Sequence, residues 1–116
     1  MAGRVASNER RVRTDDDWRL VIKLLKNGDK RADVIEELVG QHGFPKGAAT
    51  SFVGSISCVL NALEGRSKKK EGIVYRYAQY LMDHSSECPE LTETDRASTL
   101  YVDKVFSIVY PDRRPR

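Results

Sequence analysis

Large hydrophobic residues recur at helical spacing along most of this chain, and the clearest example lies between Gly47 and Leu63. Its large hydrophobic residues, which repeat about once per helical turn, are Phe52, Val53, Ile56, Val59, Leu60 and Leu63. This spacing predicts a helix with one broad hydrophobic face. The opposite face is small or polar and uncharged, and holds Thr50, Gly54, Ser57 and Asn61, with Ser51 and Ser55 beside them. Solvated helix faces usually carry charged residues, so we expect a close neighbour here: another helix, a second subunit or a nucleic-acid groove.

A first helix is predicted to follow Thr14, which is a typical N-cap residue. Asp17, at the third position of this helix, can accept a hydrogen bond from the amide of Thr14 and complete a capping box. The predicted hydrophobic stripe comprises Trp18, Val21, Ile22 and Leu25, and the outward positions are Arg19, Lys23 and Lys26. Asn27-Gly28 is a typical helix end, because Gly readily adopts the left-handed conformation of a C-terminal cap.

The second helix is predicted to use Asp29 as its N-cap and to fray between Gly40 and Gly43. The positions expected in the core are Ala32, Ile35, Leu38 and Val39, with Val34 at the margin. Pro45 then suits the first turn of the central helix, where its missing amide would have had no partner.

Two further helices are predicted in the C-terminal part of the chain. The fourth runs from about Ile73 to His84, with its stripe at Val74, Tyr77, Ala78 and Leu81. Thr92 and Asp95 form a second capping-box pair at the start of the last helix. That helix is hydrophobic on more than one side, through Ala97, Leu100, Tyr101, Val102, Val105, Phe106, Ile108 and Val109. Such a wide hydrophobic arc is typical of a helix at the centre of a bundle or against a partner.

These patterns predict an all-α fold, a compact bundle of about five helices with a helix-turn-helix-like core and no sheet. We expect residues 1–13 to form a flexible basic arm, residues 14–110 a single helical domain and residues 111–116 a basic tail. The main alternative is a strand between Thr50 and Val59, which is rich in Ser and β-branched residues.

The composition is that of a soluble globular domain, with 40% hydrophobic and 32% charged residues among 116. No hydrophobic run approaches the ~18 residues that cross a bilayer, so no membrane contact is expected. The N-terminus lacks the hydrophobic centre of a secretory signal, and Cys58 and Cys88 make no disulfide framework. We therefore expect an intracellular protein, cytoplasmic or nuclear.

The net charge is +3, and the basic residues are clustered. The clusters are Arg4, Arg10, Arg11 and Arg13, then Arg66, Lys68, Lys69 and Lys70, then Arg113, Arg114 and Arg116. Acidic stretches separate them, at Asp15 to Asp17 and between Glu87 and Asp95. Basic clusters attract polyanions, although they are also common on solvated tails.

Motifs for catalysis or metal binding are absent from the sequence, which holds no glycine-rich phosphate loop, nucleophile elbow or His-Glu metal motif. His42 and His84 have no paired ligands at zinc-site spacing, and Cys58 is expected to be a small buried thiol. We therefore expect a non-enzymatic protein without a metal or another cofactor. Tyrosines of the fourth helix, which follows a Lys-rich loop, either stack on bases or pack at the edge of the core.

Residues 12–65 resemble helix-turn-helix and Myb-like DNA-binding domains. The segment VRTDDDWRLVIKLL is similar to the opening of a Myb-like repeat, where Thr and acidic residues precede a Trp-bearing first helix. The segment PKGAATSFVGSISCVLNAL resembles a third helix of that class. The resemblance implies that this helix enters the major groove, with Lys46, Thr50, Ser51, Ser55 and Ser57 facing the bases.

The sequence thus predicts a helical domain that binds nucleic acid, in particular double-stranded DNA, with its basic clusters on phosphates. The predicted contact residues are Arg10, Arg11, Arg13, Lys46, Thr50, Ser51, Ser55, Arg66, Lys68, Lys69 and Lys70. The alternative is a protein–protein interaction module, either a helical adaptor or a subunit of a homo-oligomer. In that case the small polar face of the central helix or the wide hydrophobic face of the last helix packs against another chain.

Overall fold

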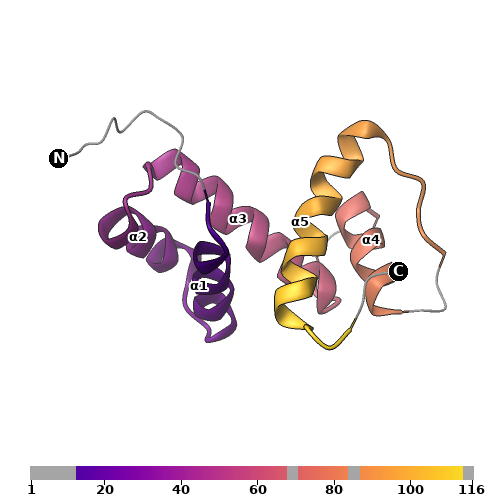
Figure 1. Ribbon diagram of the computed structural model, residues 1–116, viewed down its shortest axis with the longest axis horizontal. Coiled ribbons are helices and arrows are strands. Elements are labelled where there is room, and N and C mark those ends of the chain that lie inside the picture. The colour runs from indigo at the N-terminus through magenta and orange to yellow at the C-terminus, as the bar shows by residue number, and fades with distance from the viewer. Residues whose placement is uncertain (1–12, 68–70, 84–86, 114–116) are drawn as a thin grey trace. The chain divides into compact units, whose positions relative to one another are not determined.

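The structure is a computed structural model that describes residues 13–67, 71–83 and 87–113. Five helices and no strand occur in these ranges, as Figure 1 shows. They are α1 (Asp15–Lys26), α2 (Arg31–His42), α3 (Lys46–Leu63), α4 (Ile73–Met82) and α5 (Glu93–Val109). The predicted all-α fold is confirmed, and the stretch that offered a strand alternative lies within α3. No helix in the described ranges has the length and hydrophobicity needed to span a membrane.

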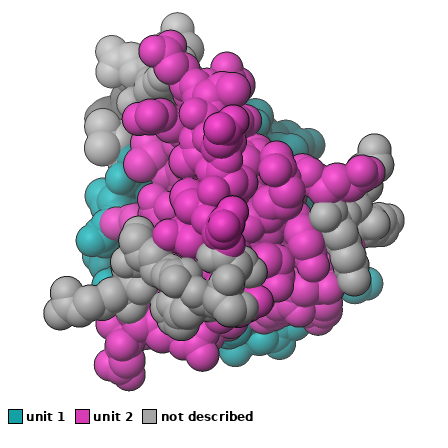
Figure 2. Space-filling model, turned by 90° about the vertical axis from the view of Figure 1, so that its right-hand side faces the viewer, with its two compact units in different colours: residues 1–54 teal, residues 55–116 magenta. Residues whose placement is uncertain are grey.

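The chain divides into two compact units, which Figure 2 colours separately. The first unit comprises residues 1–54 and contains α1, α2 and the first half of α3. The second unit comprises residues 55–116 and contains the rest of α3, α4 and α5. The expected single domain over residues 14–110 stays a prediction.

Helix α1 begins with the predicted capping box. The Oγ1 atom of Thr14 accepts a hydrogen bond from the amide of Asp17 at 3.3 Å, and Oδ2 of Asp17 accepts one from the amide of Thr14 at 2.9 Å. The pair gives partners to two amides that a helix start otherwise leaves open. The helix ends at Lys26 with Asn27 as its C-cap, and Gly28 follows with a φ of 97°, as the Asn-Gly pair predicts.

The predicted cap of α2 is wrong. Its N-cap is Lys30, one residue after Asp29, and Lys30 makes no side-chain capping bond. The predicted core face also needs correction. Val34 and Leu38 are fully buried, whereas Ala32 is exposed, Ile35 is half-buried and Val39 is 39% exposed. The hydrophobic residues of α2 cover two sides of the helix, and just one side can meet the core.

The core of the first unit centres on Phe52, which is fully buried. The Trp18 ring meets it edge-on, with centroids 5.0 Å apart and an interplanar angle of 89°. The Phe44 ring stacks on it at 5.8 Å and 12°. Edge-on and stacked aromatic pairs both contribute packing energy beyond the area that they bury. Phe52 thereby ties α3 to α1 and to the segment between α2 and α3.

In the second unit, α4 and α5 lie side by side (Figure 1). The Tyr77 hydroxyl donates to Oδ1 of Asp103 at 2.8 Å and joins these two helices. Gln79 Nε2 donates to the Ala62 carbonyl oxygen at 2.7 Å, which joins α4 to the last turn of α3. The buried hydrophobic residues are Ile56, Val59, Leu60, Ala62, Leu63, Tyr77, Ala78, Leu81, Val102, Val105 and Phe106.

Helix α5 has the predicted start. Thr92 and Asp95 form the expected capping box, with hydrogen bonds of 3.0 and 3.1 Å. Ala97 is exposed and Leu100 is 66% exposed, so the core of the second unit covers part of the hydrophobic arc and leaves these two residues outside it. The hydrophobic arc is wider than the surface that the second unit offers to α5. Helix α4 ends at Met82, and its predicted end at His84 falls outside the described residues.

Candidate nucleic-acid interface

A short turn connects α2 to α3. Gly43 has a φ of 71°, in the left-handed region that favours glycine, and it caps the end of α2. The amide of Phe44 donates to the carbonyl oxygen of Leu38 at 3.2 Å, and the Phe44 side chain is buried. Pro45 completes the turn, and Lys46 begins α3. The hydrogen bond and the buried ring together hold the start of α3 against the end of α2.

The first turns of α3 have a buried side and an exposed side. Ala49, Phe52 and Val53 are fully buried. Phe52 and Val53 belong to the predicted hydrophobic stripe, and Ala49 does not. The exposed positions are Lys46, Gly47, Thr50 and Ser51. The Thr50 hydroxyl donates to the Lys46 carbonyl oxygen at 2.8 Å, so its hydrogen is engaged and its oxygen can act as an acceptor for another molecule.

Gly54 lies on the uncharged side of α3, where the sequence predicts a close neighbour. A β-carbon placed at Gly54 meets no atom of the structure within 4 Å apart from the helix itself. At this position the predicted neighbour is therefore not a segment from the described part of the chain. Another subunit and a nucleic-acid groove are the alternatives that the sequence left open.

The predicted contact residues fall into three groups. Arg13, Lys46, Thr50 and Ser51 belong to the first unit. Ser55, which is half-buried, and Arg66, which is exposed, belong to the second unit. Arg10, Arg11, Lys68, Lys69 and Lys70 lie outside the described residues. The structure thus brings four of the predicted residues into one compact unit, three of them on a single helix face.

Two of the predicted cations already have partners inside the protein. The Arg13 guanidinium carbon lies 4.4 Å from the centroid of the Phe52 ring, a cation–π contact. This contact places the described start of the chain beside α3. Arg66 forms an ion pair with Glu64 on the surface of the second unit, which lowers its value as a site for another anion.

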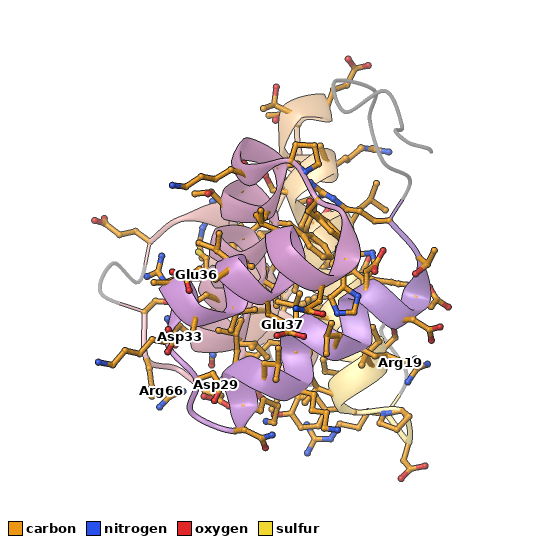
Figure 3. The ribbon with its side chains drawn as sticks, turned by 90° about the vertical axis from the view of Figure 1, so that its left-hand side faces the viewer. Arg19, Asp29, Asp33, Glu36, Glu37 and Arg66 are labelled. Carbon is orange, nitrogen blue, oxygen red and sulfur yellow. The ribbon has the colours of Figure 1, made fainter. Side chains whose placement is uncertain are left out.

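A set of basic residues on α1 was not assigned to any site by the sequence analysis. Arg19, Lys23 and Lys26 are all exposed, at the outward positions that the helical pattern predicts for them. In Figure 3, Arg19 lies toward the right of the view, Asp33 and Glu36 of α2 lie toward the left, and Glu37 of α2 lies between them. The spacing of these basic residues along α1 was the signal that could have identified them.

The described residues contain no group of three or more His, Cys, Asp or Glu side chains that could hold a metal ion. His42 lies at the end of α2 with its Nε2 atom 3.6 Å from Glu37, which is a surface contact. Cys58 and Cys88 are both exposed free thiols. The predicted burial of Cys58 is therefore wrong, since its position on α3 lies just outside the buried stripe.

Tyr77 of α4 is a packing residue. Burial is the main cause that raises the pKa of its hydroxyl far above the ordinary value, and the hydrogen bond and negative charge of Asp103 raise it further. Its ring contacts that of Tyr80, with centroids 5.8 Å apart. Of the two roles considered for the tyrosines of this helix, packing at the edge of the core is the one that Tyr77 has.

No protein-family model, curated protein or solved structure matches this chain. The features of the first unit that bear on function are the α2–α3 turn, the small polar side chains on the exposed face of α3 and the exposed basic residues.

Proposed function

We propose that the first unit is a helix-turn-helix module that binds double-stranded DNA, with the first half of α3 in the major groove. The observation that carries the proposal is the α2–α3 connection. Helix-turn-helix motifs join two helices through a turn of about three or four residues that often contains Gly. Here residues 43–45 connect the helices, and Gly43 adopts the left-handed conformation at the end of α2.

The exposed face of α3 has the shape that groove entry needs. The major groove admits one α-helix, and small side chains let that helix approach the bases closely. Gly47, Thr50 and Ser51 present little bulk on this face. The oxygen of Thr50 suits the amino groups of adenine and cytosine, and its methyl group suits the methyl group of thymine.

Basic residues near this face supply phosphate contacts in the proposal. Such contacts orient a protein on the duplex, and base contacts then select the sequence. Lys46 is exposed at the first position of α3. Arg13 lies against Phe52 of α3, and Arg10 and Arg11 precede Arg13 by three and two residues in the sequence.

Fluorescence anisotropy with labelled duplexes, over a series of salt concentrations, tests the proposal. We expect binding at low salt and an affinity whose logarithm falls linearly with the logarithm of the salt concentration. The double variant Thr50→Glu/Ser51→Glu places two carboxylates on the face that enters the groove. It should lower the affinity about tenfold or more, because lost base contacts cost ~1–3 kcal/mol each.

The matched control is Thr94→Glu/Ser107→Glu on α5. Both of these residues are exposed, and the Ser107 hydroxyl donates to a carbonyl of its own helix, as that of Thr50 does. The control should change the affinity less than about threefold, because exposed substitutions away from a contact surface have small effects. Failure of the wild-type protein to bind any duplex at low salt would overturn the proposal, as would equal losses in the two variants.

A second candidate function is that of a protein-interaction module, and one observation favours it. Leu100 on α5 is a large hydrophobic residue that is 66% exposed. Single exposed hydrophobic residues are nevertheless ordinary on soluble proteins, whereas interaction sites present larger continuous patches. This function therefore ranks below DNA binding.

A further inference from the structure

Thr50 projects from the exposed face of α3 in the first unit. Gly47, Thr50 and Gly54 follow one another at intervals of three and four residues, which places them on one side of the helix. A β-carbon placed at either glycine meets no atom within 4 Å outside the helix itself, among the residues that the structure describes. A ligand that lies along this side therefore reaches Thr50 without obstruction from its two neighbours.

An internal hydrogen bond determines what Thr50 offers to a ligand. Its hydroxyl donates to the Lys46 carbonyl oxygen at 2.8 Å, so the hydroxyl hydrogen is occupied. The oxygen keeps lone pairs and acts toward a ligand as an acceptor. The same bond favours one rotamer of the side chain and so fixes the position of its methyl group. Thr50 thus presents an acceptor and a methyl group side by side, bonded to one carbon atom.

The charges of α3 also suit a nucleic-acid ligand. Between Lys46 and Leu63 the helix contains no acidic residue, and Lys46 is exposed at its first position. An acidic side chain would repel phosphates and would compete with the Thr50 oxygen for the amino groups of bases. Helix α3 holds no such competitor, so Thr50 is free to select among bases.

The base pairs differ in the groups on their major-groove edges that match Thr50. An A·T pair presents the amino group of adenine and the methyl group of thymine, whereas a G·C pair presents the amino group of cytosine without a methyl group. Methylation of cytosine at its fifth ring position adds a methyl group beside that amino group. Guanine presents two acceptors, which the Thr50 oxygen does not match.

We infer that Thr50 selects base pairs whose major-groove edge presents an amino group together with a methyl group, either A·T or 5-methylcytosine·guanine. This inference rests on the proposed function and names the base chemistry that the groove-facing helix recognises. The Thr50 oxygen accepts from the amino group, and the Thr50 methyl group packs against that of the base. This contact adds selectivity to phosphate contacts, which carry no sequence information.

Four duplexes of equal length test the inference. One contains only A·T pairs, and a second has uracil in place of every thymine. A third contains only G·C pairs, and a fourth has 5-methylcytosine in place of every cytosine. The two members of each set have the same number of phosphates, so the ratio of their affinities reports the base methyl group. Fluorescence anisotropy at low salt measures the affinity for each duplex.

Two substitutions separate the methyl group of Thr50 from its oxygen. Thr50→Ser removes the methyl group, and Thr50→Val replaces the hydroxyl group by a second methyl group. Thr94→Ser on α5, at an exposed position of the second unit, is the matched control. Comparison with the wild type removes any effect of the base methyl group on DNA shape, because that effect is common to all the variants. Circular dichroism establishes that each variant keeps its helices.

The wild type and Thr94→Ser should bind the methyl-bearing duplex about three- to fivefold more tightly in at least one set, which identifies the base pair selected. Thr50→Ser should bind both members of that set equally. Thr50→Val should keep the preference and bind each member about threefold or more weakly.

Three results would overturn the inference and leave the proposed function standing, provided that the wild type binds duplexes. They are the absence of a preference in the wild type, a preference that Thr50→Ser retains, and an affinity of Thr50→Val equal to that of the wild type. Absence of duplex binding by the wild type at low salt would overturn both the inference and the proposed function.

Discussion

Tyr77 shows how one hydroxyl group can link stability to pH in this protein. Its hydroxyl is buried and donates to Asp103, so the folded state favours the neutral phenol and raises its pKa above the ordinary value of 10.0. The folded state thus binds this proton more tightly than the unfolded state does. The stabilisation is fully present below the ordinary pKa and is lost as the pH rises above it.

The variant Tyr77→Phe isolates this effect. At neutral pH it should lower the free energy of unfolding by about 1 kcal/mol, the net value of one hydrogen bond. Above about pH 10 the wild type should lose stability more steeply than the variant, because the variant has no proton to lose at this site. Urea unfolding followed by circular dichroism at pH 8, 10 and 11 measures both, with Tyr75→Phe on the same helix as the control. A variant with the alkaline dependence of the wild type would contradict the role given to Tyr77.

Residue-scale features could be predicted from the sequence where a few consecutive residues determine them. The pairs Thr14–Asp17 and Thr92–Asp95 each form a capping box within one helical turn, and both were predicted correctly. The N-cap expected at Asp29 was wrong, because α2 begins one residue later, with Lys30 at the cap position. Asp is a preferred N-cap residue, so residue type alone favoured the wrong position.

At the scale of elements, the turn between α2 and α3 is the part of the fold on which the proposed groove contact depends. It positions the exposed face of α3 through Gly43, whose φ of 71° is unfavourable for residues with a β-carbon. Gly40, in the preceding turn of α2, has ordinary helical geometry and open space around its α-carbon. The two glycines are three residues apart, and the backbone conformation favours glycine at position 43 and not at position 40.

Replacement of each glycine by Ala should therefore have opposite effects. Gly43→Ala should destabilise the protein by about 1–2 kcal/mol, the cost of a left-handed conformation for an L-residue. Gly40→Ala should stabilise it by about 0.5–1 kcal/mol, because Ala loses less backbone entropy in a helix. Denaturant unfolding measures both changes. Destabilisation of equal size at the two positions would show that the turn is not under the constraint described.

Helix positions were easier to predict than helix orientations. The buried side of α3 was predicted correctly from the stripe between Phe52 and Leu63, because its six large hydrophobic residues all lie on one face. In α2 and α5 the hydrophobic residues cover a wider arc than the core can accept. Leu38 is buried and Val39 is exposed, and Val102 is buried and Leu100 is exposed. Contacts with residues distant in the sequence decide which of these side chains is buried, and the periodicity of hydrophobic residues does not reveal those contacts.

At the scale of the whole molecule, the sequence predicted clusters of basic residues, and the structure shows to which unit each described contact residue belongs. Four of the predicted contact residues belong to the first unit, five lie outside the described residues, and Ser55 and Arg66 belong to the second unit. Arg19, Lys23 and Lys26 of α1 were not assigned to a site, because cations separated by hydrophobic residues do not form a cluster when the sequence is read in order. They share one side of α1 only after the helix has formed.

The state of association of the protein tests the second candidate function. We expect a monomer at ~10 μM, because one exposed Leu falls far short of the ~1,000 Å² that a specific interface buries. Leu100→Asp should leave the mass unchanged and alter stability by less than about 0.5 kcal/mol. Multi-angle light scattering measures the mass, with Thr94→Asp on the same helix as the control. A dimer that Leu100→Asp dissociates and Thr94→Asp preserves would favour the interaction module instead.

The two accessible thiols have a practical consequence for any such measurement. Cys58 and Cys88 are exposed and unpaired, so neither is protected from oxidation by burial. In air, sulfur atoms from different molecules can join covalently and produce a species of twice the mass that has nothing to do with α5. Purification with a reductant, or replacement of both residues by Ser, keeps this artefact out of the mass and of the anisotropy.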